Sequence, residues 1–157
     1  MSTYTDLLVA LKVIDDPAAY PTPQAGADAV NDTSAGTPLI YPRRVTSKDI
    51  VRDAFPGNPD GGEAVIAAMR QITRPAVVEM MRYIEPGQEG VDMGNATVRA
   101  TVDWMATIGE PQIPVPLTAQ QVAALKGLAE RAQSPAENIG WTRLVTDDEI
   151  TAARALP

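Results

Sequence analysis

The sequence of 157 residues contains no cysteine and no histidine. Without cysteine the chain has no disulfide and no thiolate nucleophile, and without either residue it lacks the usual ligands of zinc. Histidine is also the commonest general acid or base in enzymes. We therefore expect no catalytic residue, no cofactor and no metal ion, and we predict that the protein is not an enzyme.

Basic residues are also few, because 13 Lys and Arg stand against 20 Asp and Glu, for a net charge of −7. Proteins that bind along a phosphate backbone need clustered Lys and Arg, so we expect no nucleic-acid partner. Long hydrophobic runs are missing too, and a membrane span needs about 18 apolar residues. The chain begins without the basic segment of a signal peptide. We expect no membrane contact and synthesis in the cytoplasm.

What the sequence does have is apolar residues at helical spacing, in segments separated by Pro and Gly. Strict alternation of apolar and polar residues, typical of strands, is nowhere sustained. We predict an all-α fold, a small bundle of about six or seven short helices with a long Pro-rich extended arm near the N-terminus. The expected core consists of Ile66, Val98, Val102, Trp104, Met105, Leu125, Leu128 and Ile150.

Three pairs of residues have the spacing of a capping box, in which an N-cap side chain and a side chain three residues later bond each other's backbone. They are Asp60 with Glu63, Thr118 with Gln121, and Thr146 with Glu149. Each pair predicts the first turn of a helix. For this reason we interpret the acidic run 147–149 as charge at a helix N-terminus rather than as a metal site.

Residues 17–42 are rich in Pro, Gly and small polar residues and show no strong periodicity. The segment is too long for an ordinary connection between helices. We predict an N-terminal helix over 1–16, an extended Pro-rich arm over 17–45, and a helical body over 46–157. A short helix over 25–31 stays open as an alternative.

Large apolar side chains are scarce in this arm, and those present are candidates for contact with a neighbouring protein. Aromatic anchors are common energetic centres of protein interfaces, and an adjacent pair of arginines fits the charged rim of one. A Trp outside the helical stripes more often covers an edge of the core, but it is also a candidate for a further anchor. The predicted interface residues are Tyr20, Leu39, Ile40, Tyr41, Arg43, Arg44 and Trp141.

Two catalytic alternatives use the residue types that remain. Ser47 precedes Lys48 directly, but adjacent residues on a helix do not face one another. A pair of carboxylates in one cleft could support hydrolysis, and the sequence does not show which acids meet.

The C-terminal segments 117–130, 134–140 and 145–154 resemble the ending of small proteins encoded among the structural genes of tailed bacteriophages. Those proteins close with a Leu-Thr-rich helix, a Ser-Arg-Ala-Glu-x-x-Gly turn and a Val-Thr-x-x-Asp-Val-x-x-Ala-Arg helix. Pro135 stands where that pattern has Arg, and Glu149 stands where it has Asp. The match is confined to the last third of the chain.

The resemblance implies a non-enzymatic structural subunit of a virion, at the neck, the tail or the capsid surface. Its partners would be other virion proteins and copies of itself, in a homo-oligomer within the particle. The alternative is a soluble helical adaptor or assembly factor that binds one phage or host protein and is absent from the final particle.

Overall fold

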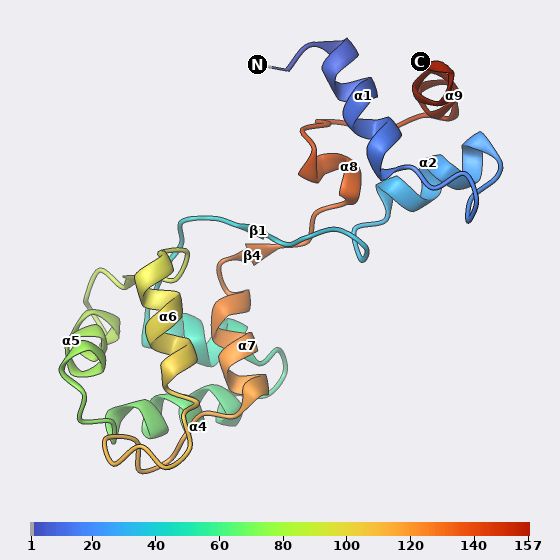
Figure 1. Cartoon of the computed structure of the whole chain (residues 1–157). Helices are drawn as coiled ribbons and strands as arrows, with labels where there is room; N and C mark the ends of the chain where they lie inside the picture. The colour runs from blue at the N-terminus through green and yellow to red at the C-terminus, as the bar shows by residue number, and fades with distance from the viewer. Residues whose placement is uncertain (1) are drawn as a thin grey trace. The chain divides into compact units, whose positions relative to one another are not determined.

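The structure is a computed structural model that describes residues 2–157 (Figure 1). The fold is mainly helical, as predicted, with 52% of the chain in helices. Short strands of two residues each accompany the helices, so the fold is all-α only approximately. None of the helices in residues 2–157 has the length and apolar character needed to cross a bilayer.

The described chain divides into two compact units. The central unit comprises residues 40–130, and the terminal unit comprises residues 2–39 and 131–157. Strands β1 (Leu39–Ile40) and β4 (Glu130–Arg131) form a two-stranded sheet where the chain passes from one unit to the other. This division differs from the predicted ranges 1–16, 17–45 and 46–157, because residues from both ends of the chain share one unit.

The central unit packs short helices around one core. In chain order its elements are β2 (Arg44–Val45), α3 (Ser47–Asp49), the π-helix η1 (Ile50–Ala54), α4 (Pro59–Arg70), α5 (Pro75–Ile84), β3 (Val91–Asp92), α6 (Ala96–Trp104) and α7 (Ala119–Gly127). Strands β2 and β3 are antiparallel, with Arg44 opposite Asp92 and Val45 opposite Val91.

Most of the predicted core lies where it was expected. Six of these residues are buried, namely Ile66, Val102, Met105, Leu125 and Leu128 in the central unit and Ile150 in the terminal unit. Val98 and Trp104 are only partly buried at the edge of the core. The Trp104 ring packs against the core and also makes a cation–π contact with the guanidinium of Arg74, 4.2 Å from the ring centre.

Helix caps explain where several helices begin. Thr118 and Gln121 form the predicted capping box of α7, and Thr146 and Glu149 form that of α9 (Asp147–Ala155). The prediction of Asp60 as the cap of α4 was wrong. Asn58 caps this helix instead, by accepting from the backbone N–H of Gly61. Pro59 occupies the first position of α4, where its fixed φ suits a helix and its missing N–H costs nothing.

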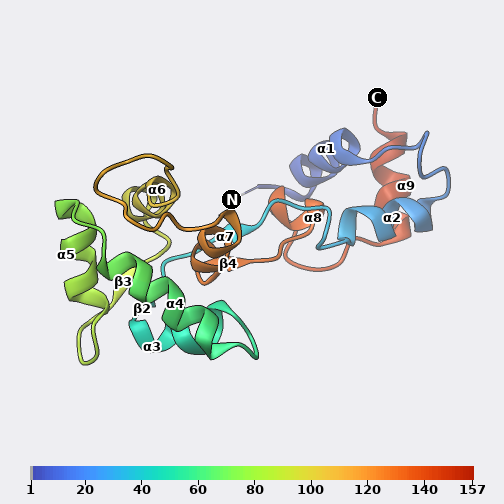
Figure 2. The ribbon, with the colours of Figure 1, turned by 90° about the horizontal axis from the view of Figure 1, so that it is seen from below.

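The terminal unit joins α1 (Tyr4–Ile14), α2 (Pro23–Asn31), α8 (Pro135–Asn138) and α9. Helices α1 and α2 both pack against α9, and Figures 1 and 2 show these helices beside one another. Their core is formed by Leu11, Val30, Trp141 and Ile150 among others. The sequence predicted the N-terminal helix and the burial of Ile150, but it did not show that the two ends of the chain pack together.

The structure differs from the predicted extended arm over 17–45. Its middle forms α2, which buries Gly26, Ala27 and Val30 within the terminal unit. Gly26 lies so close to α9 that an added Cβ would stand 3.2 Å from Ile150. Small side chains allow helices to approach closely, so a segment with few large apolar residues still packs. The alternative of a short helix over 25–31 therefore describes this stretch better than the arm does.

Candidate protein-interaction surface

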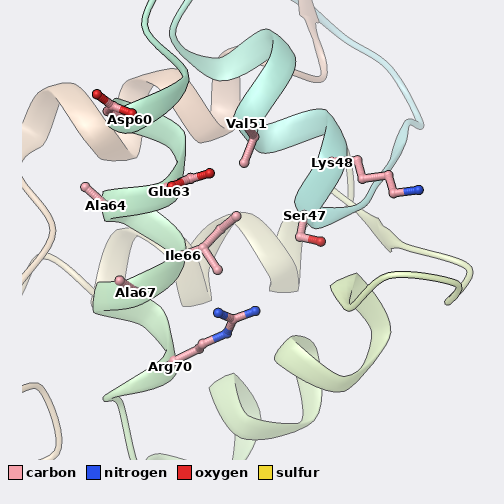
Figure 3. Close-up of a pocket in the computed structure, with 9 residues that line it drawn as sticks. All are labelled: Ser47, Lys48, Val51, Asp60, Glu63, Ala64, Ile66, Ala67 and Arg70. Carbon is pink, nitrogen blue, oxygen red and sulfur yellow. The ribbon is translucent and has the colours of Figure 1, made fainter.

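An open groove of about 880 Å³ lies between α4 and the consecutive α3 and η1 in the central unit (Figure 3). We call it the α4 groove. Val51 of η1 and Ile66 of α4 supply apolar side chains from the two walls. Ala64 and Ala67 of α4 are exposed along it and add little bulk. The groove is therefore open and is lined along its length by small or at least partly buried apolar side chains.

The two walls of the α4 groove are held together by a close backbone approach at Gly62. A Cβ built on this residue would stand 2.6 Å from Cα of Val51 and 2.7 Å from the carbonyl oxygen of Ile50. Any side chain at position 62 would collide with the backbone of η1, so the short distance between α4 and η1 at this crossing requires glycine. This contact sets the spacing of the walls at the base of the groove.

Charged side chains of opposite sign lie at the two ends of α4 along the groove. Asp60 and Glu63 lie toward the N-terminal end of α4, and Arg70 lies at its C-terminal end (Figure 3). The Arg70 guanidinium also pairs with Glu85, with Nη2 3.1 Å from Oε1, and both side chains are exposed. The exposed Lys48 belongs to the opposite wall. One end of the α4 face is thus acidic and the other basic.

Ser47 and Lys48 both line the groove, but their side chains do not meet. Ser47 is buried beneath the wall, and Lys48 extends away from α4 (Figure 3). Within residues 2–157 no cluster of three or more Asp or Glu side chains is arranged to hold a metal ion. The chemistry that the groove offers is apolar contact flanked by charges of both signs.

Three of the predicted interface residues leave substantial apolar area exposed. The exposed fractions are 43% for Tyr20, 38% for Leu39 and 49% for Ile40. Tyr20 follows α1, and its carbonyl accepts from Nη2 of Arg154 at 2.7 Å. Leu39 and Ile40 form β1. Their side chains are accessible to a partner.

Tyr41, Arg43 and Arg44 lie in the central unit and are engaged there to different degrees. The Tyr41 hydroxyl and Nη1 of Arg43 both donate to the carbonyl of Leu128, at 3.3 and 2.8 Å. Arg43 also pairs with Asp53 at 2.7 Å, so it stabilises its own chain rather than standing free at a rim. Arg44 is largely exposed and lies 3.6 Å from the carboxylate of Glu89.

Asp53 is held in its charged form by two arginines. The hydrogen bond from Arg52, together with that from Arg43, lowers the pKa of Asp53 to about 2. Burial opposes this shift but does not cancel it. The carboxylate therefore stays ionised at any pH near neutrality and joins η1 to Arg43, the residue before β2.

Trp141 lies inside the terminal unit, with only 5% of its surface exposed. Its ring meets Tyr4 edge to face, with centroids 6.2 Å apart, and the guanidinium of Arg143 lies 5.5 Å from the ring centre. Its Nε1 has no hydrogen-bond partner within the described chain. The side chain contributes to the core and is not presented to a neighbour.

Arg143 also forms a short ion pair with Glu149, the buried capping residue of α9. Burial alone would raise the pKa of Glu149, but hydrogen bonds from Arg143 and Thr146 outweigh it and the pKa is lowered. The pair fixes the start of α9 against the preceding loop.

The α4 groove was not predicted from the sequence. The exposed face of α4 was visible in the sequence as Asp60, Glu63, Ala64, Ala67 and Arg70, at the spacing of one helical face. What the sequence did not show is the wall opposite that face. The opposite wall consists of α3 and η1. Its position beside α4 depends on the turn between η1 and α4 and on the close contact at Gly62.

Comparison with protein-family models, with curated proteins and with solved structures gives no match to the chain.

Proposed function

We propose that the chain is a non-enzymatic structural subunit of a tailed-phage virion, placed at the neck, the tail or the capsid surface. It acts through contacts with other virion proteins and with copies of itself. The observation on which the proposal chiefly rests is the α4 groove, an accessible apolar trough between charges of opposite sign.

The shape and chemistry of the groove suit a protein segment. Protein interfaces combine an apolar centre with a polar rim, and a helix laid in an apolar groove is a recurring mode of recognition. Val51 and Ile66 supply the apolar part, and the charged side chains at the ends of α4 supply the rim. The exposed Leu39 and Ile40 offer a second apolar surface at β1.

The resemblance to phage structural proteins is the second support. Its polar positions have structural roles here, because Thr118–Gln121, Ser134–Glu137 and Thr146–Glu149 all form capping boxes. Pro135, where the family pattern has Arg, occupies the first turn of α8, a position that suits proline. The resemblance therefore concerns how this end of the chain folds, and the virion assignment follows from the family that shares the pattern.

Sedimentation of a lysate tests the proposal. Particles from a culture that expresses the chain from its native locus are separated on a density gradient, and the chain is followed with an antibody. We expect it to sediment with intact particles and to remain at the top of the gradient in lysates of a mutant that assembles none. Recovery only at the top of both gradients would overturn the proposal and favour the assembly-factor alternative.

A further inference from the structure

The exposed face of α4 has a charge order that is complementary to itself. Along this face the residues run acidic, acidic, small, small and basic, as Asp60, Glu63, Ala64, Ala67 and Arg70. If two such helices meet antiparallel, the acidic end of each faces the basic end of the other. If they meet parallel, like charges face each other. The charge order therefore selects one orientation.

Helix geometry places the charges in register. Glu63 and Arg70 are seven residues apart, which is close to two turns and about 10 Å along the axis. A two-fold axis midway between Ala64 and Ala67 sets Ala64 of one copy opposite Ala67 of the other. The same axis sets Arg70 opposite position 61 of the second copy. A long arginine side chain at that point reaches both Asp60 and Glu63.

The outer side of α4 leaves room for such a pairing. Ala64 and Ala67 are exposed and point away from the wall that bears Val51, whereas Glu63 and Arg70 project toward the α4 groove (Figure 3). A second α4 can therefore approach along the two alanines, whose small side chains do not hold the helices apart. The long side chains of Glu63 and Arg70 then reach across from the edge of the groove.

We propose that the exposed face of α4, beside the α4 groove, binds α4 of a second copy of this chain, antiparallel, about a two-fold axis between Ala64 and Ala67. The contact is isologous, meaning that the same surface is used on both copies, as in most two-fold dimers. This inference deepens the proposed function and rests on it for its biological setting, while the contact itself is argued from the charges and the small side chains of this face.

The existing Arg70–Glu85 pair is compatible with this contact. Both side chains are exposed, with exposed fractions of 56% and 39%, and an exposed pair holds its arginine weakly. A guanidinium has five N–H donors, so Arg70 can keep its pair with Glu85 and also donate to carboxylates of the second copy.

Sedimentation velocity of the purified full chain over a range of concentrations tests the proposal. We expect a monomer–dimer equilibrium for the native chain. Arg70→Glu places acid against acid and should raise the dissociation constant at least about tenfold, and Glu63→Arg should do the same by placing base against base. The matched control is Arg82→Glu, which makes the same charge change on an exposed residue of α5 outside the groove, and should leave the dissociation constant unchanged.

The most discriminating experiment mixes the two charge-reversed chains. Glu63 of the Arg70→Glu chain would face Arg70 of the Glu63→Arg chain, and the two new side chains would face each other with opposite sign. We expect the mixture to dimerise more tightly than either variant alone. Circular dichroism checks that both variants remain folded. Recovery of the dimer in the mixture is an independent sign that both variants are folded.

The proposal is overturned if the native chain stays monomeric, or if Arg70→Glu weakens association no more than Arg82→Glu does. It is also overturned if the mixed variants fail to associate while the native chain dimerises. These outcomes are separate from the gradient experiment. A monomeric chain that sediments with particles would refute the dimer alone, and a dimeric chain absent from particles would refute the proposed function alone.

Discussion

Replacing Gly62 by alanine should destabilise the central unit, although alanine is the better helix former. The added Cβ would stand 2.6 Å from Cα of Val51, whereas real Cβ atoms essentially never come within 3.0 Å of such an atom. The obstructing atoms belong to the backbone of η1, so no side chain can rotate out of the way. Helix α4 and η1 would have to separate, and the walls of the α4 groove would move with them.

Two opposing effects set the size of this change. A glycine-to-alanine change in a helix interior contributes about 1 kcal/mol of stability, and overpacking a tight contact costs about 1–3 kcal/mol. We place the cost near its upper end because the contact is with backbone, which gives a net loss of about 2 kcal/mol. Gly127, at the end of α7, has nothing within 4 Å of its Cβ position. Gly127→Ala should therefore raise the stability of the same unit by up to about 1 kcal/mol.

The assay is urea unfolding followed by tryptophan fluorescence. The two tryptophans report on different units, because Trp104 lies in the central unit and Trp141 in the terminal unit. Placing all variants on a Trp141→Phe background leaves Trp104 as the reporter of the central unit alone. A Gly62→Ala chain as stable as its parent, or more stable, would refute the close approach of α4 and η1.

Three further changes test other parts of the fold. Leu125→Ala should cost about 2–5 kcal/mol, since this side chain is fully buried, and an unfolding midpoint equal to the parent's would remove it from the core. Gly26→Ala brings a Cβ to 2.9 Å from both Nη2 of Arg154 and Oδ1 of Asp15, so this ion pair has to shift. Overpacking costs about 1–3 kcal/mol and the helix gains about 1 kcal/mol, so the terminal unit should lose up to about 2 kcal/mol, measured through Trp141 on a Trp104→Phe background. A gain in stability would place α2 away from α9. The lowered pKa of Glu149 means that the folded chain binds fewer protons than the unfolded chain. The stability that Glu149 contributes is therefore present at pH values above its pKa in the unfolded chain, near 4.5. It is lost as the pH falls through the lower pKa of Glu149 in the folded chain. Glu149→Gln should be less stable than the parent at neutral pH and lose less stability on acidification, and identical pH profiles of the two chains would contradict this account.

Local structure was largely predictable from the sequence because its causes are local. The Thr118–Gln121 and Thr146–Glu149 boxes need only two side chains and the backbone between them. Apolar spacing likewise located most of the core, including Leu125 and Ile150. At α4 the capping-box spacing favoured Asp60, but the cap is Asn58, two residues earlier.

The long-range arrangement could not be predicted in the same way. The segment around Gly26 appeared too poor in large apolar residues to fold, but its small residues are what let α2 approach α9. The bidentate pair of Asp15 with Arg154 links positions 139 residues apart in the chain. No periodicity within one segment indicates which distant helix will complete its surface.

The candidate site shows the same limit. Five residues of α4 could be read as one exposed face, but the opposing wall and the closeness enforced by Gly62 are properties of the folded unit. Among the predicted interface residues, Leu39 and Ile40 remain exposed, whereas Trp141 is buried. Whether an aromatic residue outside a helical stripe anchors a partner or closes its own core depends on neighbours that the sequence does not identify.

The central claim is that the chain is a built-in component of a particle. Absolute quantitation by mass spectrometry measures its copy number relative to the major capsid protein through successive rounds of particle purification. The account predicts a fixed stoichiometric ratio that further purification does not change. A ratio that falls toward zero with each round would contradict it.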